Sequence, residues 1–367
     1  MHKLFLHRAG EAHLCASPAF FLFFRLKSGH TFAIIERSFE RRLNDIMSRT
    51  PFLFFDVIPG QDRTAQLQSA IDSAADCGGT VALAPGEFLC GKLTLRSGVT
   101  LCGTPLWTDD AQSGTVLTLC DPCADCLLDL SGAAGAAVCG MTLRGSLLGA
   151  AVHGIFAKST EAERLGLRFE DVKCTEFSGD GIHLAAVRDA EVRHCLLCRN
   201  GGCGIVLHGQ ELTLTDTVCH ANRKNGADVS GTSVNLSSAR FYENGENGIA
   251  VQKADSVCIV SCGAEKNGVY GIFLQGEKER LCRGVNVEGC SFRQNGTAHL
   301  FADCVCALCA CHNLFSPAEE NPPYALVLCR LRDAAVRCNL LTKSYALAPI
   351  ENADNHRGQI ALSQNIG

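Results

Sequence analysis

Asn200-Gly-Gly-Cys-Gly-Ile-Val-Leu207 is the first of four copies of one motif, an asparagine followed four residues later by glycine and then by an apolar-x-apolar triplet. The other copies are N-R-K-N-G-A-D-V (222–229), N-G-E-N-G-I-A-V (244–251) and N-G-V-Y-G-I-F-L (267–274). A fifth asparagine, Asn295, carries His299 at the glycine position. The five asparagines are 22, 22, 23 and 28 residues apart (222 − 200, 244 − 222, 267 − 244, 295 − 267). Such repeats of short alternating strands predict a β-solenoid with one coil per repeat.

The repeated asparagines are interpreted as structural residues. Stacked coils lie about 4.8 Å apart, and an amide has donors on its nitrogen and acceptor sites on its oxygen. Identical amides on successive coils therefore hydrogen-bond along the stack, as they do wherever identical strands stack in register. Gly181 and Gly154 extend the glycine spacing upstream by 23 (204 − 181) and 27 (181 − 154) residues, so the solenoid begins before the first asparagine.

A short helix is predicted at the start of the solenoid, with Thr64 as its N-cap and Gly78-Gly79 as its end. Its apolar positions lie on one face, at Leu67, Ile71, Ala74 and Ala75. Such a helix would cover the core that the first coil exposes. We therefore expect an initial strand and capping helix over 47–85, a parallel β-helix over 86–345, and a C-terminal cap or tail over 346–367.

The segment 56–103 contains three further motifs, G-Q-D-R-T-A-Q-L-Q-S-A-I-D (60–72), G-G-T-V-A-L-A-P-G (78–86) and L-R-S-G-V-T-L-C-G (95–103). They resemble the first part of the pectate-lyase and polygalacturonase superfamily, and with the coils the resemblance covers about residues 56–315. It implies an all-β fold, a right-handed parallel β-helix with a short N-terminal capping α-helix. It also implies a polysaccharide or oligosaccharide as the partner.

Residues 1–46 differ from the rest of the chain. The apolar run at 18–24 is too short to span a membrane, and no small-residue cleavage site follows it. Codons for the Glu-Arg-Arg that precedes Met47 can form a purine-rich ribosome-binding sequence in a bacterial gene. We expect translation to start at Met47, with residues 1–46 a non-native or disordered extension of a bacterial protein; an intact mass that includes them would contradict this.

Composition favours one long β domain and excludes several partners. The chain has 367 residues, 36 glycines and 47% apolar residues, which suits a continuous aliphatic core. Its net charge is −5, whereas nucleic acid or an anionic membrane surface requires a basic face. We therefore expect neither as a partner, and the oligomeric state stays open.

The 23 cysteines indicate a reducing compartment. Cys195, Cys262 and Cys290 each lie five residues before a repeated asparagine, in a column shared with Thr217 and Ala239, so they are interpreted as small core residues. The runs C-D-P-C-A-D-C (120–126) and C-V-C-A-L-C-A-C-H (304–312) lack convergent fourth ligands, and we assign no metal to them. A cytoplasmic location is expected.

Candidate site residues follow from the alternation of each strand after its glycine. Residues two and four positions after the glycine are expected to face solvent and to align in columns. The candidates for contacts to sugar rings, hydroxyl groups and uronates on this surface are Phe156, Lys158, Asp228, Gln252, Phe273, Gln275 and Asp303.

Catalysis is assigned to Asp180, His183 and His208. The resemblance would place the polygalacturonase motifs N-T-D, D-D and G-H-G on successive coils, but here they are S-G-D (178–180), G-C (202–203) and N-G (225–226). Only Asp180 remains, so the general acid and general base of a hydrolase are incomplete. A lyase needs a base near C5 of a uronate, and Ca²⁺ or cationic side chains to neutralise its carboxylate. His183 with Asp180 is our first candidate for the base.

Three classes of function stay open. The first is a carbohydrate-active enzyme, either a polysaccharide lyase or a glycoside hydrolase, that acts on an acidic or pectin-like glycan. The second is a glycan-binding β-helix without catalysis. The third is a structural or adhesive β-solenoid, such as a fibre component. A walled cluster of Lys158, Asp180, His183 and His208 would favour the enzyme, and a flat open face would favour binding.

Overall fold

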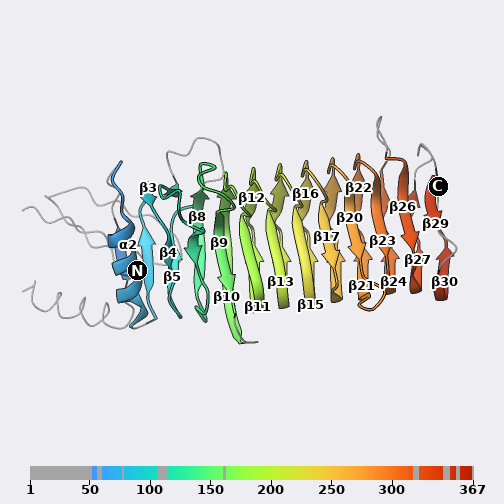
Figure 1. The fold of residues 1–367 in the computed structure, drawn as a ribbon, viewed down its shortest axis with the longest axis horizontal. Helices are drawn as coiled ribbons and strands as arrows, with labels where there is room; N and C mark the ends of the chain where they lie inside the picture. Colours follow the sequence, from blue (N-terminus) through green and yellow to red (C-terminus); the bar gives the residue numbers. More distant parts are fainter. Residues whose placement is uncertain are drawn as a thin grey trace, which may run out of the picture. The chain divides into compact units, whose positions relative to one another are not determined.

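The computed structural model describes residues 52–55, 60–76, 78–105, 114–159, 163–316, 322–341, 348–352 and 356–365. The predictions for residues 1–46 lie outside these ranges. One helix, α2 (Thr64–Ala75), precedes a stack of parallel coils. Figure 1 shows α2 at one end of that stack. In the part of the chain described, no helix is long and apolar enough to cross a membrane.

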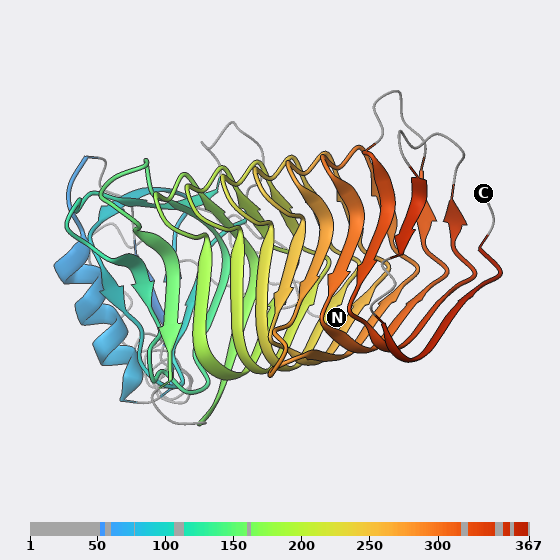
Figure 2. The ribbon, with the colours of Figure 1, turned by 45° about the vertical axis from the view of Figure 1, so that its right-hand side comes forward.

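Each regular coil contributes strands to three faces, and all strand pairs are parallel (Figure 2). The first face contains β7 (Cys126–Asp129), β9 (His153–Lys158), the first parts of β11 (Ile182–Arg193), β13 (Ile205–Thr215) and β15 (Ala227–Ser237), then β17 (Ile249–Gln252), β20 (Tyr270–Gln275), β23 (Ala298–Asp303), β26 (Tyr324–Cys329) and β29 (Ala348–Asn352).

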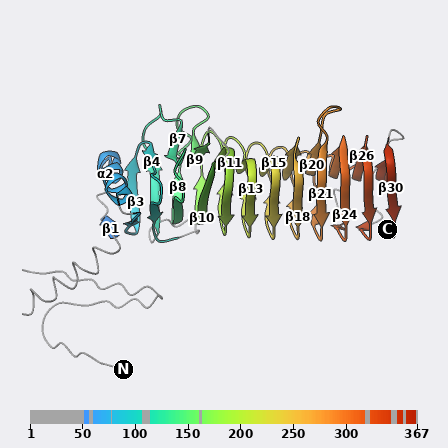
Figure 3. The ribbon, with the colours of Figure 1, turned by 90° about the horizontal axis from the view of Figure 1, so that it is seen from below.

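The second face, visible in Figure 3, contains β10 (Arg164–Thr175), the later parts of β11, β13 and β15, and then β18 (Asp255–Val260), β21 (Cys282–Glu288), β24 (Val305–Cys311), β27 (Arg332–Arg337) and β30 (Arg357–Ser363). The third face contains β12 (Leu196–Cys198), β14 (Val218–His220), β16 (Arg240–Tyr242), β19 (Gly263–Glu265), β22 (Ser291–Arg293), β25 (Leu314–Phe315) and β28 (Leu340–Leu341). The first coils contain β1 (Phe52–Phe55), β2 (Thr80–Leu83), β3 (Gly86–Cys90), β4 (Leu93–Thr94), β5 (Thr100–Cys102), β6 (Thr115–Leu119) and β8 (Ala137–Arg144).

The core is a column of aliphatic side chains inside the coils. Residues one and three positions after the repeated glycine are buried, as in Ile205 with Leu207 and Ile249 with Val251. This alternation is what a strand with one covered face requires. The prediction of a parallel β-solenoid with one N-terminal helix is confirmed.

The five repeated asparagines are buried and stack on one another. The Asn222 amide nitrogen donates to the Asn244 side-chain oxygen (3.0 Å), and the Asn244 nitrogen donates to Asn267 (3.0 Å). The residue before each asparagine has a positive φ, for example 55° at Glu243. Such left-handed backbone is unfavourable for residues other than glycine, so the stacked amides hold a turn that the local sequence disfavours.

A second asparagine stack occupies another corner in the last coils, which the sequence analysis missed. The Asn313 amide nitrogen donates to Asn339, and that of Asn339 donates to Asn365, at 3.0 Å each. This stack continues the column of Cys195 and Cys290, since the Cys290 N–H donates to the Asn313 side-chain oxygen (2.9 Å). The three asparagines are 26 residues apart (339 − 313, 365 − 339), and that spacing was the available signal.

Two expectations about the ends of the solenoid are corrected. Thr64 is the first helical residue and not the N-cap, because its own N–H donates to the Asp62 carboxylate at 2.8 Å. Residues 348–352 and 357–363, expected within a C-terminal cap or tail, are strands of the solenoid. They are β29 and β30, which continue the parallel ladders of β26 and β27. The edges of β26 and β27 would otherwise expose unpaired backbone groups, and a strand edge favours pairing with a further strand. This explains the extra coil formed by β29 and β30.

Candidate functional site

The first face aligns the candidate residues in columns. In the column two positions after the glycine, adjacent side chains are ladder partners on neighbouring coils. That column is Asp129, Phe156, His183, Val206, Asp228, Ala250, Phe273 and Phe301. Four positions after the glycine, Lys158, Ala185, His208 and Ser230 are partners in the same way, as are Gln252, Gln275 and Asp303.

Not every position in these columns faces solvent. Val206 and Ala250 are buried, although both lie two positions after the glycine. His183 and Asp228 are partly exposed on either side of Val206. The polar and aromatic side chains of the first face are therefore separated into groups and do not form one continuous surface.

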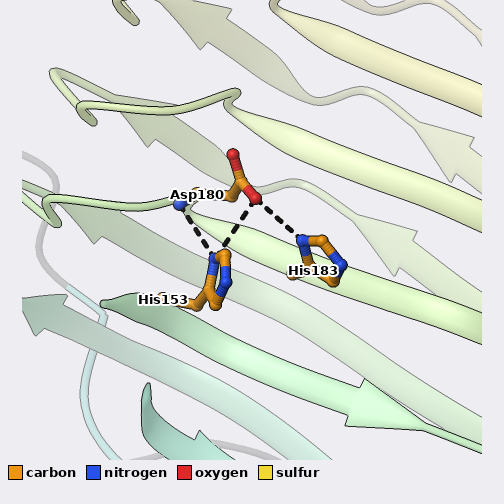
Figure 4. Close-up of side chains that lie close together, drawn as sticks. All are labelled: His153, Asp180 and His183. Carbon is orange, nitrogen blue, oxygen red and sulfur yellow. Dashed lines mark hydrogen bonds and ion pairs between the residues drawn. The ribbon is translucent and has the colours of Figure 1, made fainter. Parts of the chain in front are cut away.

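The first group is the His153–Asp180–His183 cluster (Figure 4). His183 Nδ1 lies 2.8 Å from Asp180 Oδ2, and His153 Nδ1 lies 3.2 Å from the same oxygen. His153 and Asp180 each lie one residue before the glycine of their coil, at the turn into the first face. Parallel stacking places these two turns side by side, and the turn at Asp180 directs its carboxylate toward His183, three residues later near the start of β11.

Asp180 is an ionised carboxylate with both of its oxygens engaged by neighbouring groups. Its side chain is 12% exposed, and its other oxygen accepts the Cys203 backbone N–H at 2.6 Å. Burial alone would raise the pKa of Asp180, but the hydrogen bonds from His153, His183 and Cys203 offset burial and hold this pKa well below its usual range. Asp180 therefore orients other groups and cannot supply a proton near neutral pH.

The ionised carboxylate fixes the tautomer of His183. A carboxylate only accepts hydrogen bonds, so His183 Nδ1 carries a proton, and in the neutral imidazole Nε2 keeps the lone pair. The ring lies between Phe156 and His208, with ring centroids 5.5 and 6.4 Å away. His183 Nε2 is consequently an oriented proton acceptor, in the way that an aspartate orients a catalytic imidazole.

His153 Nδ1 has two partners that require opposite states of the same atom. The Asp180 backbone N–H donates to it at 3.0 Å, which needs a lone pair. The Asp180 carboxylate oxygen lies 3.2 Å away, and an attractive contact there needs a proton on Nδ1. The imidazole of His153 lies 4.6 Å from that of His183 between ring centroids. A proton gained or lost by His153 therefore changes the field at His183.

A second His–Asp pair lies next to this cluster. His208 Nε2 is 2.9 Å from Asp228 Oδ1, and the Asn225 amide nitrogen donates to Asp228 Oδ2 at 3.2 Å. Here the carboxylate engages Nε2, so Nδ1 is the remaining nitrogen of His208. The predicted catalytic histidines thus lie close together, but each is oriented by a different carboxylate.

The other candidates lie further from this pair of clusters. Lys158 is exposed on β9, directly opposite Ala185. Gln252 and Gln275 are exposed ladder partners on β17 and β20. Asp303 is buried, and the Arg330 guanidinium binds both of its oxygens, with Nε 2.7 Å from Oδ1. Asp303 is therefore engaged by an arginine and is not an open contact for a ligand.

The His153–Asp180–His183 cluster could also hold a metal ion. Its three donor atoms lie within 4.8 Å of one another, and it is the only group of this kind among the described residues. Two imidazoles with one carboxylate suit Zn²⁺ or another transition metal. Ca²⁺ prefers six to eight oxygen ligands, so these residues do not fit the Ca²⁺ that a lyase could use.

His153 is the site residue that the sequence analysis missed. Its signal is the histidine directly before Gly154, matching the aspartate directly before Gly181. Strand alternation after each glycine predicts solvent-facing residues only at positions two and four. It does not include the turn position before the glycine, where His153 and Asp180 meet.

Comparison with known proteins gives independent support for the fold. The family described as right-handed beta helix region matches residues 180–327. The chain is a right-handed parallel β-helix protein. No curated protein matches the sequence significantly.

Three solved structures are similar to this β-helix. The A-module of the mannuronan C-5 epimerase AlgE6 of Azotobacter vinelandii is 19% identical with a TM-score of 0.58, over 84% of this chain and 96% of the module. PfbA, a surface adhesin of Streptococcus pneumoniae, is 12% identical with a TM-score of 0.66, over 84% and 88%. The Dettilon tailspike protein is 13% identical with a TM-score of 0.59, over 87% and 70%. At these identities the likeness establishes the fold.

Proposed function

We propose that this β-helix protein acts on an acidic polysaccharide, and that His183 removes the proton at C5 of a uronate residue. The observation that carries the proposal is the 2.8 Å contact between His183 Nδ1 and the buried, ionised Asp180. That contact leaves Nε2 as an oriented base at the partly exposed surface of the first face.

The proton transfer follows from the orientation of the two histidines. His183 Nε2 takes the C5 proton, and the electron pair of the C5–H bond moves into the neighbouring carboxylate as an enolate. Asp180 stabilises the imidazolium that forms, and a protonated His208, whose Nε2 is held by Asp228, gives its Nδ1 proton from the adjacent coil. In a lyase, the C4–O bond then breaks, C4=C5 forms, and the leaving oxygen takes the proton. In an epimerase, a proton returns to C5 from the opposite side.

Hydrolysis is less well supported by the same residues. A glycosidase needs one protonated carboxyl group as acid and a second carboxylate as base or nucleophile. Asp180 has a lowered pKa and three hydrogen-bond donors around it. Asp228 is held by His208 and Asn225. Neither carboxylate is placed to protonate a leaving oxygen.

The substrate class is supported by the fold and by the names of its neighbours. The epimerase module acts on mannuronan at C-5, which is the proton transfer proposed for His183. Another similar structure is a tailspike described as a capsular polysaccharide depolymerase, 12% identical with a TM-score of 0.51. Lys158, exposed one coil from His183, can neutralise the carboxylate of the bound uronate.

The test is incubation with polymannuronate, polygalacturonate and neutral glycans in D₂O, with Ca²⁺ and with a chelator. Ultraviolet absorbance of an unsaturated product indicates elimination. Deuterium at C5 without chain cleavage indicates epimerisation. Either result should be lost in His183→Ala and kept in Gln210→Ala, an exposed residue further along the same ladder on β13. New reducing ends without an unsaturated product would show hydrolysis and contradict the proposal.

A second candidate is glycan binding without chemistry. It is favoured by three aromatic residues of the first face that are partly exposed, Phe156, Phe273 and Phe301, and by the likeness to a surface adhesin. Binding of a glycan that shows neither exchange, elimination nor hydrolysis would select this candidate.

A further inference from the structure

A cationic hollow lies at the turns that follow the first face near the C-terminal end of the solenoid. Its volume is about 350 Å³, and it is lined by Lys278, Leu281, Cys304, Arg330, Leu331, Arg332 and Arg357. Four of these seven side chains are cations, and none is a carboxylate. Asp303 neutralises Arg330 from the adjoining coil. In the described ranges, no carboxylate lies within ion-pair distance of Lys278, Arg332 or Arg357.

Two of the arginines face each other in the ladder. Arg332 of β27 and Arg357 of β30 are direct partners on neighbouring coils, so their backbones lie about 4.8 Å apart. Like charges directly opposite in a sheet are destabilising. An anion between the two guanidinium groups would remove this repulsion and accept charge-assisted hydrogen bonds from both.

A stack of aromatic rings lies on β20 and β23, two of the strands that lead into the turns lining the hollow. Tyr270 and Phe273 of β20 are 5.4 Å apart between ring centroids, and Phe273 and Phe301 of β23 are 5.3 Å apart with 18° between ring planes. All three side chains are partly exposed.

The hollow lies further along the solenoid than the His153–Asp180–His183 cluster, at the turns that follow the same face. The strands β20, β23 and β26 end at Gln275, Asp303 and Cys329, and the next residues enter the turns that line the hollow. The hollow extends from the coil of Gly271 to the coil of Arg357, which are four and seven coils from Gly181, or about 19 and 34 Å at 4.8 Å per coil. A glycan chain that lies along the first face can contact both places.

We infer that this hollow is a second subsite, which binds the carboxylate of a uronate several sugar residues from the reacting one. The inference rests on the proposed acidic substrate and adds where the chain is held. Another hollow, of about 440 Å³ on the third face, has a different character, because Glu243 and Glu265 line it together with its cations. There Lys266 lies 3.9 Å from Glu243, so an anion would meet carboxylates.

The test is binding of hexamannuronate and hexagalacturonate by calorimetry, compared with their carboxyl-reduced neutral forms. The variant is Arg332→Ala with Arg357→Ala, and the control is Arg240→Ala, an exposed arginine of the third-face hollow. We expect the double variant to bind at least one of the two hexauronates about tenfold to a hundredfold more weakly, since each lost charge-assisted contact contributes on that order. Arg332→Lys with Arg357→Lys should keep much of the affinity and its salt dependence.

The outcomes separate this subsite from the chemistry at His183. Weaker hexauronate binding in the double alanine variant, with the Arg240→Ala control unchanged, supports the subsite whether or not the protein reacts. Unchanged affinity for hexauronates in that variant overturns the subsite, even if proton exchange at C5 occurs. An equal loss for the neutral oligomers, or no binding of either hexauronate by the native protein, overturns it too.

Discussion

Asp180→Asn should reverse the tautomer of His183 while keeping the shape of the site. The Cys203 N–H, 2.6 Å from the carboxylate, requires an oxygen at that position. The amide nitrogen of the substituted side chain must therefore face His183 Nδ1, where an N–H would meet an N–H. The ring avoids this contact by moving its proton to Nε2, and Nε2 then cannot accept one.

The size of the effect follows from two losses. Restoring the active tautomer leaves a buried donor without an acceptor, which costs about 1–3 kcal/mol. The imidazolium that forms during proton transfer also loses a charge-assisted hydrogen bond worth about 1.5–3 kcal/mol. Together these amount to about 2.5–6 kcal/mol, which slows the reaction by about 10²–10⁴-fold.

The assay measures C5 exchange or elimination together with the ¹⁵N chemical shifts of His183. We expect the slower reaction and a proton on Nε2 in Asp180→Asn. The matched control for the tautomer is Asp228→Asn, which removes the charge beside His208 and should leave His183 protonated at Nδ1. A His183 ring that stays protonated at Nδ1 in Asp180→Asn, or full activity of that variant, would refute the reasoning.

Three further predictions concern stability and metal binding. Asn244→Ala should lower the free energy of unfolding by about 2–3 kcal/mol, because it leaves buried hydrogen-bond partners unsatisfied. Asn235→Ala, at an exposed position on β15, should change the free energy of unfolding by less than about 0.5 kcal/mol. Equal effects of the two variants in denaturant titrations would contradict the structural role of the asparagine stack. The pKa of Asp180 is lowered in the folded protein, so its ionised form contributes to stability above the unfolded pKa of about 3.9 and this contribution is lost as the pH falls below that value. The melting temperature of Asp180→Asn should therefore depend less on pH below about 4 than that of the native protein. Parallel pH profiles of the two melting temperatures would contradict this prediction. Zn²⁺ should bind the His153–Asp180–His183 cluster, raise the melting temperature and inhibit proton transfer. His153→Ala should weaken all three effects. An unchanged Zn²⁺ affinity in that variant would exclude this cluster as the Zn²⁺ site.

The columns of the first face could be predicted because they depend on a period that the sequence displays. In a parallel stack, residues one repeat apart are neighbours at about 4.8 Å, so equal positions after each glycine meet. His183 therefore pairs with Phe156 and Val206 in the ladder, as the counting indicated. The same reasoning placed His183 and His208 on neighbouring coils, whereas Asp180 came from the comparison with the polygalacturonase motifs.

The electrostatic state of the site could not be predicted in this way. His153 and Asp180 meet at a turn, where strand alternation does not give the direction of a side chain. The Cys203 N–H that helps to lower the pKa of Asp180 comes from the next coil, 23 residues later (203 − 180). Arg330, which engages Asp303, lies in another turn 27 residues away (330 − 303).

The coil length, the inward aliphatic core, the N-terminal helix and the asparagine stack follow from the amino-acid sequence, because each depends on residues at a fixed spacing along the chain. The packing of the coils fixed which candidate side chains are available to a ligand. It buried Val206 and Ala250, engaged Asp303 with Arg330, and brought His153 to Asp180. The physical reason is that backbone hydrogen bonds set the register between coils, whereas exposure and protonation depend on side chains from several turns at once.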